Sequence, residues 1–419
     1  MDLIFAEASP PGRGGVSVIR LSGPGALNLL QKLAGPVQEP RRAMLRTLRD
    51  GNEILDQALV IWFEAGRSFT GEEVVEFQLH GAPVVVRRLM ATLQAEGCRL
   101  AEAGEFSRRA FLNGRMNLVD IEALGDLLAA ETEAQRKLAM QNANGVLGRK
   151  ADEWRKNLIH AGALVEVSID FADEDVPDEV PAEAFDIVRK LRAELDHETQ
   201  GFAAAERLRK GFEVAVIGPP NAGKSSLINR IARREVALVS DIAGTTRDII
   251  ELRTDLKGLA VTFLDTAGLR DSDDKIEAMG VELALRRAKN ADLRLHVSEA
   301  GVVDANLWTD GDLLVHSKAD LHGLERGVSA RTGQGIDRLL DKVYDELVEK
   351  TAGAGLIAHQ RQWEAIMAAK NALTGVEGLP AEIFAEAIRQ ASISLDRLVG
   401  RIGAEDYLDV IFSSFCIGK

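Results

Sequence analysis

The pattern of hydrophobic and polar positions changes several times along the chain, and each change predicts a different kind of domain. Up to about residue 115, alternating β-branched runs at 16–21 and 74–79 predict strands, and 83–94 predicts an amphipathic helix. Turns rich in glycine and proline separate these segments. We therefore expect an α+β domain over residues 1–115.

From 116 to 210 the apolar residues recur at helical spacing instead. Pro177 and Pro181 lie among acidic residues and predict a turn, after which helical spacing resumes over 183–209. This pattern predicts the first part of a helical domain, residues 116–210.

A buried-strand pattern at 212–217 opens a third region, 211–350, in which strands and helices alternate. Such alternation is typical of a parallel sheet with crossover helices, so this region is expected to be an α/β domain. The remainder, 351–419, returns to helical spacing in three segments: 356–376, 381–399 and 405–412. We expect it to be a second part of the helical domain.

Composition narrows the class of protein. A chain of 419 residues is too long for one core, and 46% hydrophobic with 28% charged residues is ordinary for a soluble protein. No run of about 18 apolar residues predicts a membrane span, and the first residues do not look like a signal peptide. Two cysteines, Cys98 and Cys416, are too few for a disulfide framework, so a reduced, cytoplasmic compartment is expected. The net charge of −14 argues against binding nucleic acid by the whole surface.

The strongest chemical signal is a phosphate-binding loop. Residues 218–225 read Gly-Pro-Pro-Asn-Ala-Gly-Lys-Ser, between the strand at 212–217 and a predicted helix at 226–232. Lys224 is expected to reach the β- and γ-phosphates, and the Ser225 hydroxyl to bind Mg²⁺. The residues of this loop expected to contact nucleotide are Asn221, Ala222, Gly223, Lys224, Ser225 and Ser226. The alternative is a chance glycine turn.

Two further motifs complete a guanine-nucleotide site. Asp265, Thr266, Ala267 and Gly268 follow a predicted strand; Asp265 is placed to hold Mg²⁺ through water, and the Gly268 N–H to contact the γ-phosphate. The base-reading elements follow another strand and consist of Ser317, Lys318, Ala319 and Asp320, then Ser329, Ala330 and Arg331. The Asp320 carboxylate can accept from N1–H and the exocyclic amine of guanine, which adenine does not offer. The alternative for Asp320 is a helix cap.

These motifs, together with Gly-Thr-Thr-Arg-Asp at 244–248, resemble the bacterial MnmE (TrmE) family of tRNA-modification GTPases, in the TrmE-Era-EngA-like P-loop superfamily. Segments 10–16, 106–113 and 416–419 extend the resemblance from end to end. It implies a folate-binding and dimerisation domain at the N-terminus. It also implies an all-α helical domain into which a Ras-like G domain is inserted.

The resemblance further implies potassium-dependent hydrolysis of GTP, with the G domains of two subunits meeting across their nucleotides. The implied K⁺ ligands are Asn221, Ser240, Ile242 and Thr245. The implied Mg²⁺ ligands are Ser225 and Thr246. The resemblance also implies that the residues between them contact the nucleotide, namely Asp241, Ala243 and Gly244. Leu269 stands where Ras-like enzymes carry the glutamine that orients water. The family's water-orienting glutamate falls on Glu277, which on charge pattern alone reads as a solvated helix carboxylate.

The resemblance assigns binding of 5-formyltetrahydrofolate, or a related folate, to Arg20, Glu76, Arg115 and Lys419. From the residues alone each is a surface charge. Cys416 is implied as a catalytic thiol, or else is a small apolar residue of the tail. Ser317 replaces the usual asparagine of the family, and Arg331 the usual lysine.

Taken together, these features predict a cytoplasmic homodimer that works with a flavin-dependent partner, MnmG in the family. The implied reaction modifies carbon 5 of the wobble uridine of certain tRNAs with an aminomethyl or carboxymethylaminomethyl group, and tRNA is bound through the complex. A GTP-switched ribosome-assembly or RNA-binding factor remains the alternative, and an ATP-dependent P-loop enzyme is a second rival that Asp320 disfavours.

Overall fold

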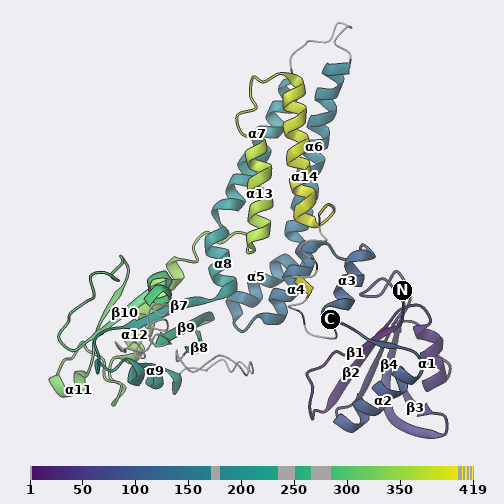
Figure 1. Ribbon diagram of the computed structural model, residues 1–419, viewed down its shortest axis with the longest axis horizontal. Helices are drawn as coiled ribbons and strands as arrows, with labels where there is room; N and C mark the ends of the chain where they lie inside the picture. Colours follow the sequence, from purple (N-terminus) through teal and green to yellow (C-terminus); the bar gives the residue numbers. More distant parts are fainter. Residues whose placement is uncertain are drawn as a thin grey trace, which may run out of the picture. The chain divides into compact units, whose positions relative to one another are not determined.

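The computed structural model describes residues 2–170, 180–234, 251–265 and 285–403, and also residues 408, 411, 412, 415 and 418 near the C-terminus. It describes the side chains of all of these residues except 168–170. The chain divides into two compact units. The first comprises residues 1–125 and 393–419, and the second comprises residues 126–392. Figure 1 shows the elements of both.

The first unit contains a six-stranded sheet in the order β3-β4-β5-β2-β1-β6. Its strands are β1 (Ile4–Glu7), β2 (Val16–Ser22), β3 (Met44–Asp50), β4 (Glu53–Phe63), β5 (Val74–His80) and β6 (Arg99–Leu100). All neighbours pair antiparallel except β1 and β6, which are parallel. The strands predicted at 16–21 and 74–79 are therefore adjacent in space as β2 and β5.

Helices α1 (Ala26–Ala34) and α2 (Pro83–Ala95) bury their apolar faces against this sheet. Leu30 and Leu89 are fully buried with Ile19 and Phe77 of the strands. Helix α3 (Glu105–Leu112) and helix α4 (Leu118–Ala129) follow. The result is the α+β arrangement that the alternating pattern predicts.

The helices of the second unit come from both sides of the nucleotide-motif region of the sequence. They are α5 (Glu133–Ala143), α6 (Val146–Asp170), α7 (Ala182–Gln200), α8 (Phe202–Lys210), α13 (Gln360–Ala372) and α14 (Ala381–Val399), whose last residues belong to the first unit. Figure 1 shows α6, α7, α13 and α14 side by side.

Specific contacts join the two sets of helices. The Lys370 ammonium lies 2.5 Å from the Asp196 carboxylate, and the rings of Phe202 and Trp363 stack with centroids 5.7 Å apart. These contacts join α13 to α7 and α8. The α/β region is therefore inserted into a single helical domain, as the expected fold class requires.

The inserted region is built on a five-stranded sheet in the order β11-β10-β7-β9-β8. Its strands are β7 (Phe212–Ile217), β8 (Glu251–Leu256), β9 (Leu259–Asp265), β10 (Leu293–Ser298) and β11 (Leu313–His316). Only the β8–β9 pair is antiparallel. Its described helices include α9 (Lys224–Ala232), α11 (Ala319–His322) and α12 (Ile336–Glu349).

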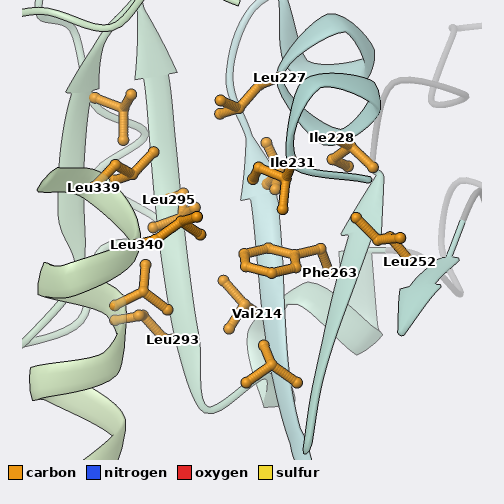
Figure 2. Packing of buried hydrophobic residues seen from close by; sticks show 14 of the residues in the cluster. Val214, Leu227, Ile228, Ile231, Leu252, Phe263, Leu293, Leu295, Leu339 and Leu340 are labelled. Atoms are coloured by element: carbon orange, nitrogen blue, oxygen red, sulfur yellow. The ribbon is translucent and has the colours of Figure 1, made fainter. Parts of the chain in front are cut away.

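Helices α9 and α12 pack on the same face of this sheet. Figure 2 shows Ile228 and Leu340 of these helices pointing toward Phe263, Val214 and Leu295 of the strands. The exposed fraction of each of these five side chains is 3% or less, so water is excluded from this layer.

Three predicted helices have different bounds in the structure. The helix expected at 226–232 begins two residues earlier, at Lys224, as α9. The helix expected over 183–209 is interrupted at Gly201, where α7 ends and α8 begins; a side chain there would come within 2.4 Å of the backbone nitrogen of Gly355, so the position requires glycine. The helix expected from 356 begins at Gln360, because buried Ile357 and Ala358 belong to the incoming connector. The segment expected at 405–412 lies largely outside the described residues. No described helix is long and apolar enough to span a bilayer.

A buried ion pair holds β10 to the start of β11. The Arg294 Nε donates to Asp312 Oδ2 at 2.7 Å, and the two side chains are 6% and 1% exposed. We expect Arg294→Met to lower the free energy of unfolding of this sheet by about 3–5 kcal/mol, because it leaves the Asp312 carboxylate buried without its counter-charge. Hydrogen exchange of the β10 amides measures the change. The double variant Arg294→Met/Asp312→Asn should lose less of the free energy of unfolding than Arg294→Met alone. An equal or larger loss would contradict the electrostatic explanation.

Candidate functional site

The predicted nucleotide motifs converge at one edge of the sheet. The parallel strands β7, β9, β10 and β11 end there, and the motif segments leave from β7, β9 and β11 at positions 218, 265 and 317. In open parallel sheets this carboxyl edge is the usual ligand-binding position. The strand topology therefore brings together motifs that lie about a hundred residues apart in the sequence.

The loop between β7 and α9 has a backbone that only certain residues can adopt. Gly218, Asn221 and Gly223 have positive φ values of 148°, 61° and 95°. A side chain at Gly218 would come within 2.1 Å of the Val297 carbonyl oxygen on β10. The motif glycines are thus needed both for the turn and for close approach to the neighbouring strand. The loop leads into the N-terminus of α9, where the helix dipole favours an anion.

Lys224 folds back over this loop. Its Nζ donates to the carbonyl oxygens of Gly218 at 2.7 Å and Pro219 at 3.0 Å. Burial lowers the pKa of Lys224 from its usual value, and the negative charge of nearby Asp265 opposes that shift. Asp265 ends β9 and is 4% exposed. An ammonium and a carboxylate are therefore both held beside the phosphate loop, which suits a phosphate group and its divalent cation.

A hollow of about 790 Å³ lies over the phosphate loop. Its lining includes the loop with Ser225 and Ser226, and also His296 and the segment 302–307. The His296 ring is 4.8 Å from the Trp308 ring, and burial lowers the pKa of His296, so the imidazole is neutral at neutral pH. The volume is sufficient for a nucleotide phosphate chain and sugar.

A second hollow of about 210 Å³ lies beside the base-reading elements. It shares the lining residues Gly223, Ser226 and Lys318 with the larger one, so the two hollows adjoin. Asp320 and Arg331 also line it, and the hydroxyl of buried Ser317 makes no hydrogen bond to any described residue. A hydrogen bond from Ser329 lowers the pKa of Asp320, as does Arg331, so its carboxylate is ionised and can only accept hydrogen bonds.

Three residues expected to bind folate lie in the first unit. Arg20 and Glu76 face each other across β2 and β5, and Arg20 Nε and Nη2 donate to Glu76 Oε1 at 3.0 and 2.9 Å. The Arg20 guanidinium also lies over the Phe69 ring, 5.7 Å from its centroid. The Arg115 side chain lies beside Gly71 of the same loop.

The chain matches two family models that together cover almost all of it. One, described as the MnmE helical domain, matches residues 118–416; the other, described as the GTP-binding protein TrmE N-terminus, matches residues 3–115. The chain belongs to the MnmE (TrmE) family. The family match confirms the resemblance read from the motifs.

Full-length relatives agree with this assignment. The tRNA modification GTPase MnmE of Paracoccus denitrificans is 62% identical over the whole of both chains, and that of Dinoroseobacter shibae is 49% identical over the whole of both. The solved G domain of the FeoB iron transporter of T. maritima is 21% identical, covering 32% of this chain and 98% of that chain, with a TM-score of 0.24.

Several residues expected from the MnmE resemblance lie outside the described part of the chain. They are Ser240, Asp241, Ile242, Ala243, Gly244, Thr245, Thr246, Thr266, Ala267, Gly268, Glu277, Cys416 and Lys419. Their roles remain predictions. Among the described residues, the structure brings Asn221, Lys224 and Asp265 together on one side of the site and Ser317 to Asp320 with Ser329 to Arg331 on the other.

Sequence reasoning missed the wall of the larger hollow. His296 lies within a buried strand and Asp304 and Leu307 in an irregular segment, and none belongs to a nucleotide motif. The feature that exposes this wall is the connection between β10 and β11. It comprises residues 299–312 and contains no helix in the structure, although a helix usually joins two parallel strands. It therefore leaves the end of β10 open to the site.

Proposed function

We propose that this chain is a GTP hydrolase that takes part in tRNA modification, as the names of its full-length relatives state for them. The observation that carries the proposal is the pair of adjoining hollows at one sheet edge, with Lys224 over the phosphate loop in one and ionised Asp320 in the other. The first part can hold phosphates, and the second can distinguish guanine from adenine by hydrogen bonding.

The described residues fit magnesium as well as nucleotide. Ser225 is the second residue of α9, directly after Lys224, and buried Asp265 ends the strand beside the loop. Hydroxyl and carboxylate oxygens are the ligands that Mg²⁺ prefers. We therefore assign Ser225 as a direct ligand and Asp265 as a ligand through water. Mg²⁺, when bound, would neutralise charge on the phosphates.

The potassium proposal uses Asn221, which lines the larger hollow. Its side chain can offer an amide oxygen beside the phosphates, and the further oxygens would come from Ser240, Ile242 and Thr245. K⁺ would supply the positive charge that an arginine finger supplies in other GTPases. Thr246 is proposed as a further Mg²⁺ ligand, and Glu277 as the residue that orients the attacking water.

The folate and partner proposals rest on family membership and on the first unit. Arg20 and Arg115 can bind the folate carboxylates, and Glu76 can accept from the donors of the pterin ring. We propose a homodimer that works with the flavin-dependent MnmG and uses 5-formyltetrahydrofolate or a related folate. Lys419 is proposed as a further folate ligand, and Cys416 as a catalytic thiol.

The wobble-uridine reaction is tested in cells. Cells lacking this protein should lose the group at carbon 5 of the wobble uridine of certain tRNAs, and the intact gene should restore it, as measured by mass spectrometry of tRNA nucleosides. Unchanged wobble uridines together with a ribosome-assembly defect would support the alternative, a GTP-switched assembly factor.

Base recognition is tested by Asp320→Asn. The amide can no longer accept from both guanine donors, so GTP affinity should fall about 100-fold, while xanthosine triphosphate, which carries a carbonyl in place of the amine, should gain affinity. Competition binding with GTP, ATP and xanthosine triphosphate measures both changes. Unchanged GTP affinity would remove Asp320 from the base site.

Cation dependence is tested at Asn221. GTP turnover by the unmodified protein should be faster in KCl than in NaCl at equal ionic strength, and Asn221→Gly should erase the difference. Glycine suits the φ of 61°, so this variant removes the side-chain oxygen without backbone strain. Asn221→Asp, which keeps an oxygen and tolerates the same φ, is the matched control and should still respond to K⁺. Equal turnover of the unmodified protein in both salts would rule out the potassium proposal.

A further inference from the structure

The carboxylate that is expected to read guanine already has a cationic partner. Arg331 forms an ion pair with Asp320, with 3.0 Å between Arg331 Nε and Asp320 Oδ2. The Asp320 side chain is 12% exposed and the Arg331 side chain 78% exposed. Both line the hollow of about 210 Å³. The guanidinium therefore lies at the entrance of the base site and bonds to one of the two oxygens that the base needs.

Guanine and Arg331 require the same acceptor. The base presents two parallel donors, N1–H and the exocyclic amine, so it binds best when both carboxylate oxygens face it. Asp320 also accepts a hydrogen bond from Ser329, which uses further acceptor capacity. A carboxylate has about four lone-pair positions, and their directions limit which donors fit at once. Loss of the Arg331 contact frees Oδ2 for the base.

The other cation of the base-reading element is engaged elsewhere. The Lys318 ammonium forms a close ion pair with Glu299, and His322 lies 3.4 Å from the same carboxylate. Of the described cations that line the hollow, Lys318 is therefore paired with Glu299 and Arg331 with Asp320.

We propose that Arg331 is an internal competitor for the guanine-reading carboxylate and so sets the rate at which guanine nucleotides leave. This inference rests on the proposed function, because it takes Asp320 as the residue that binds the base. When the base moves away while the phosphates are still held, Arg331 pairs with Asp320 again and keeps the base from docking back, so the nucleotide leaves faster. When the base returns, the exposed guanidinium swings into water at little cost. Arg331 is in this sense a specificity-determining residue, since it opposes only ligands that need Asp320.

The test compares two variants that remove the same charge from the full-length protein. Arg331→Gln removes the competitor, whereas Arg326→Gln removes an exposed arginine five residues earlier. The probe is the fluorescent N-methylanthraniloyl derivative of GDP, and stopped-flow displacement by excess GDP gives its dissociation rate. An exposed ion pair contributes little, so dissociation from Arg331→Gln should slow by up to about fivefold. Arg326→Gln should leave the rate unchanged or raise it, because loss of positive charge weakens attraction to an anion.

The sign of the change decides the outcome. If Arg331→Gln released GDP as fast as Arg326→Gln, Arg331 would not compete for Asp320. If it released GDP faster than Arg326→Gln, Arg331 would be a support of the base, and the inference would be overturned.

A second experiment distinguishes a failure of this inference from a failure of the proposed function. In an Asp320→Asn background the charge pair is gone, so adding Arg331→Gln should change release of xanthosine diphosphate no more than adding Arg326→Gln does. If Asp320→Asn gained no affinity for xanthosine nucleotides, the base site itself would be misplaced. If the gain occurred while Arg331→Gln behaved like Arg326→Gln with GDP, only the competitor role would fail.

Discussion

The nucleotide site depends on the close approach of the phosphate loop to strand β10. At Gly218 the chain turns within van der Waals distance of the Val297 carbonyl, a position from which any side chain is excluded. This approach holds the start of the loop, at the end of β7, against the neighbouring strand β10. In the strand order β11-β10-β7-β9-β8 the loop therefore follows a strand with β10 and β11 on one side and β9 on the other. The hollow beside His296 and the base-reading hollow both follow from that placement.

The same sheet is attached to the helical domain by two adjacent connectors. One leaves α8 for β7, and the other runs from α12 to α13. The second connector contacts both ends of α8: the Gly355 N–H donates to the carbonyl of Gly201, which precedes α8, at 3.3 Å, and Arg209 Nε, in the last turn of α8, donates to the Ala358 carbonyl at 2.8 Å. The second connector therefore runs alongside α8, the helix that leads into the first connector. A change at the nucleotide edge can reach the helices through this pair of segments, as well as through the contacts of α5 and α8 with β9.

The two parts of the site differ in how firmly their charged side chains are held. Beside the phosphate loop, buried Lys224 and Asp265 are held by the backbone and by burial, so they are pre-organised for a phosphate and its cation. In the base-reading part the ion pairs of Lys318 and Arg331 are partly open to water and can exchange at low cost. Tight placement suits the reacting phosphates, and exchangeable pairing suits a base that must enter and leave.

The sequence by itself determined the elements and the chemistry that depend on local pattern. The strand at 212–217 and the helix at 381–399 have the bounds in the structure that their periodicity predicts, and the phosphate loop lies between strand and helix as its glycines require. These features could be predicted because the backbone angles and the alternation of buried positions are set by neighbouring residues. The segments 10–16, 106–113 and 416–419, which resemble the MnmE family, extended the prediction of family membership to the whole chain.

Only the tertiary structure decided how distant segments meet. Gly201 must be glycine because another part of the chain, at Gly355, lies against it, and no local signal marks that contact. His296 became part of the site because the β10–β11 connection leaves the end of its strand uncovered. The bond between Arg331 and Asp320 joins residues whose separation along the chain does not reveal whether their side chains touch. In each case the outcome depends on packing between segments, which the hydrophobic pattern of either segment alone does not contain.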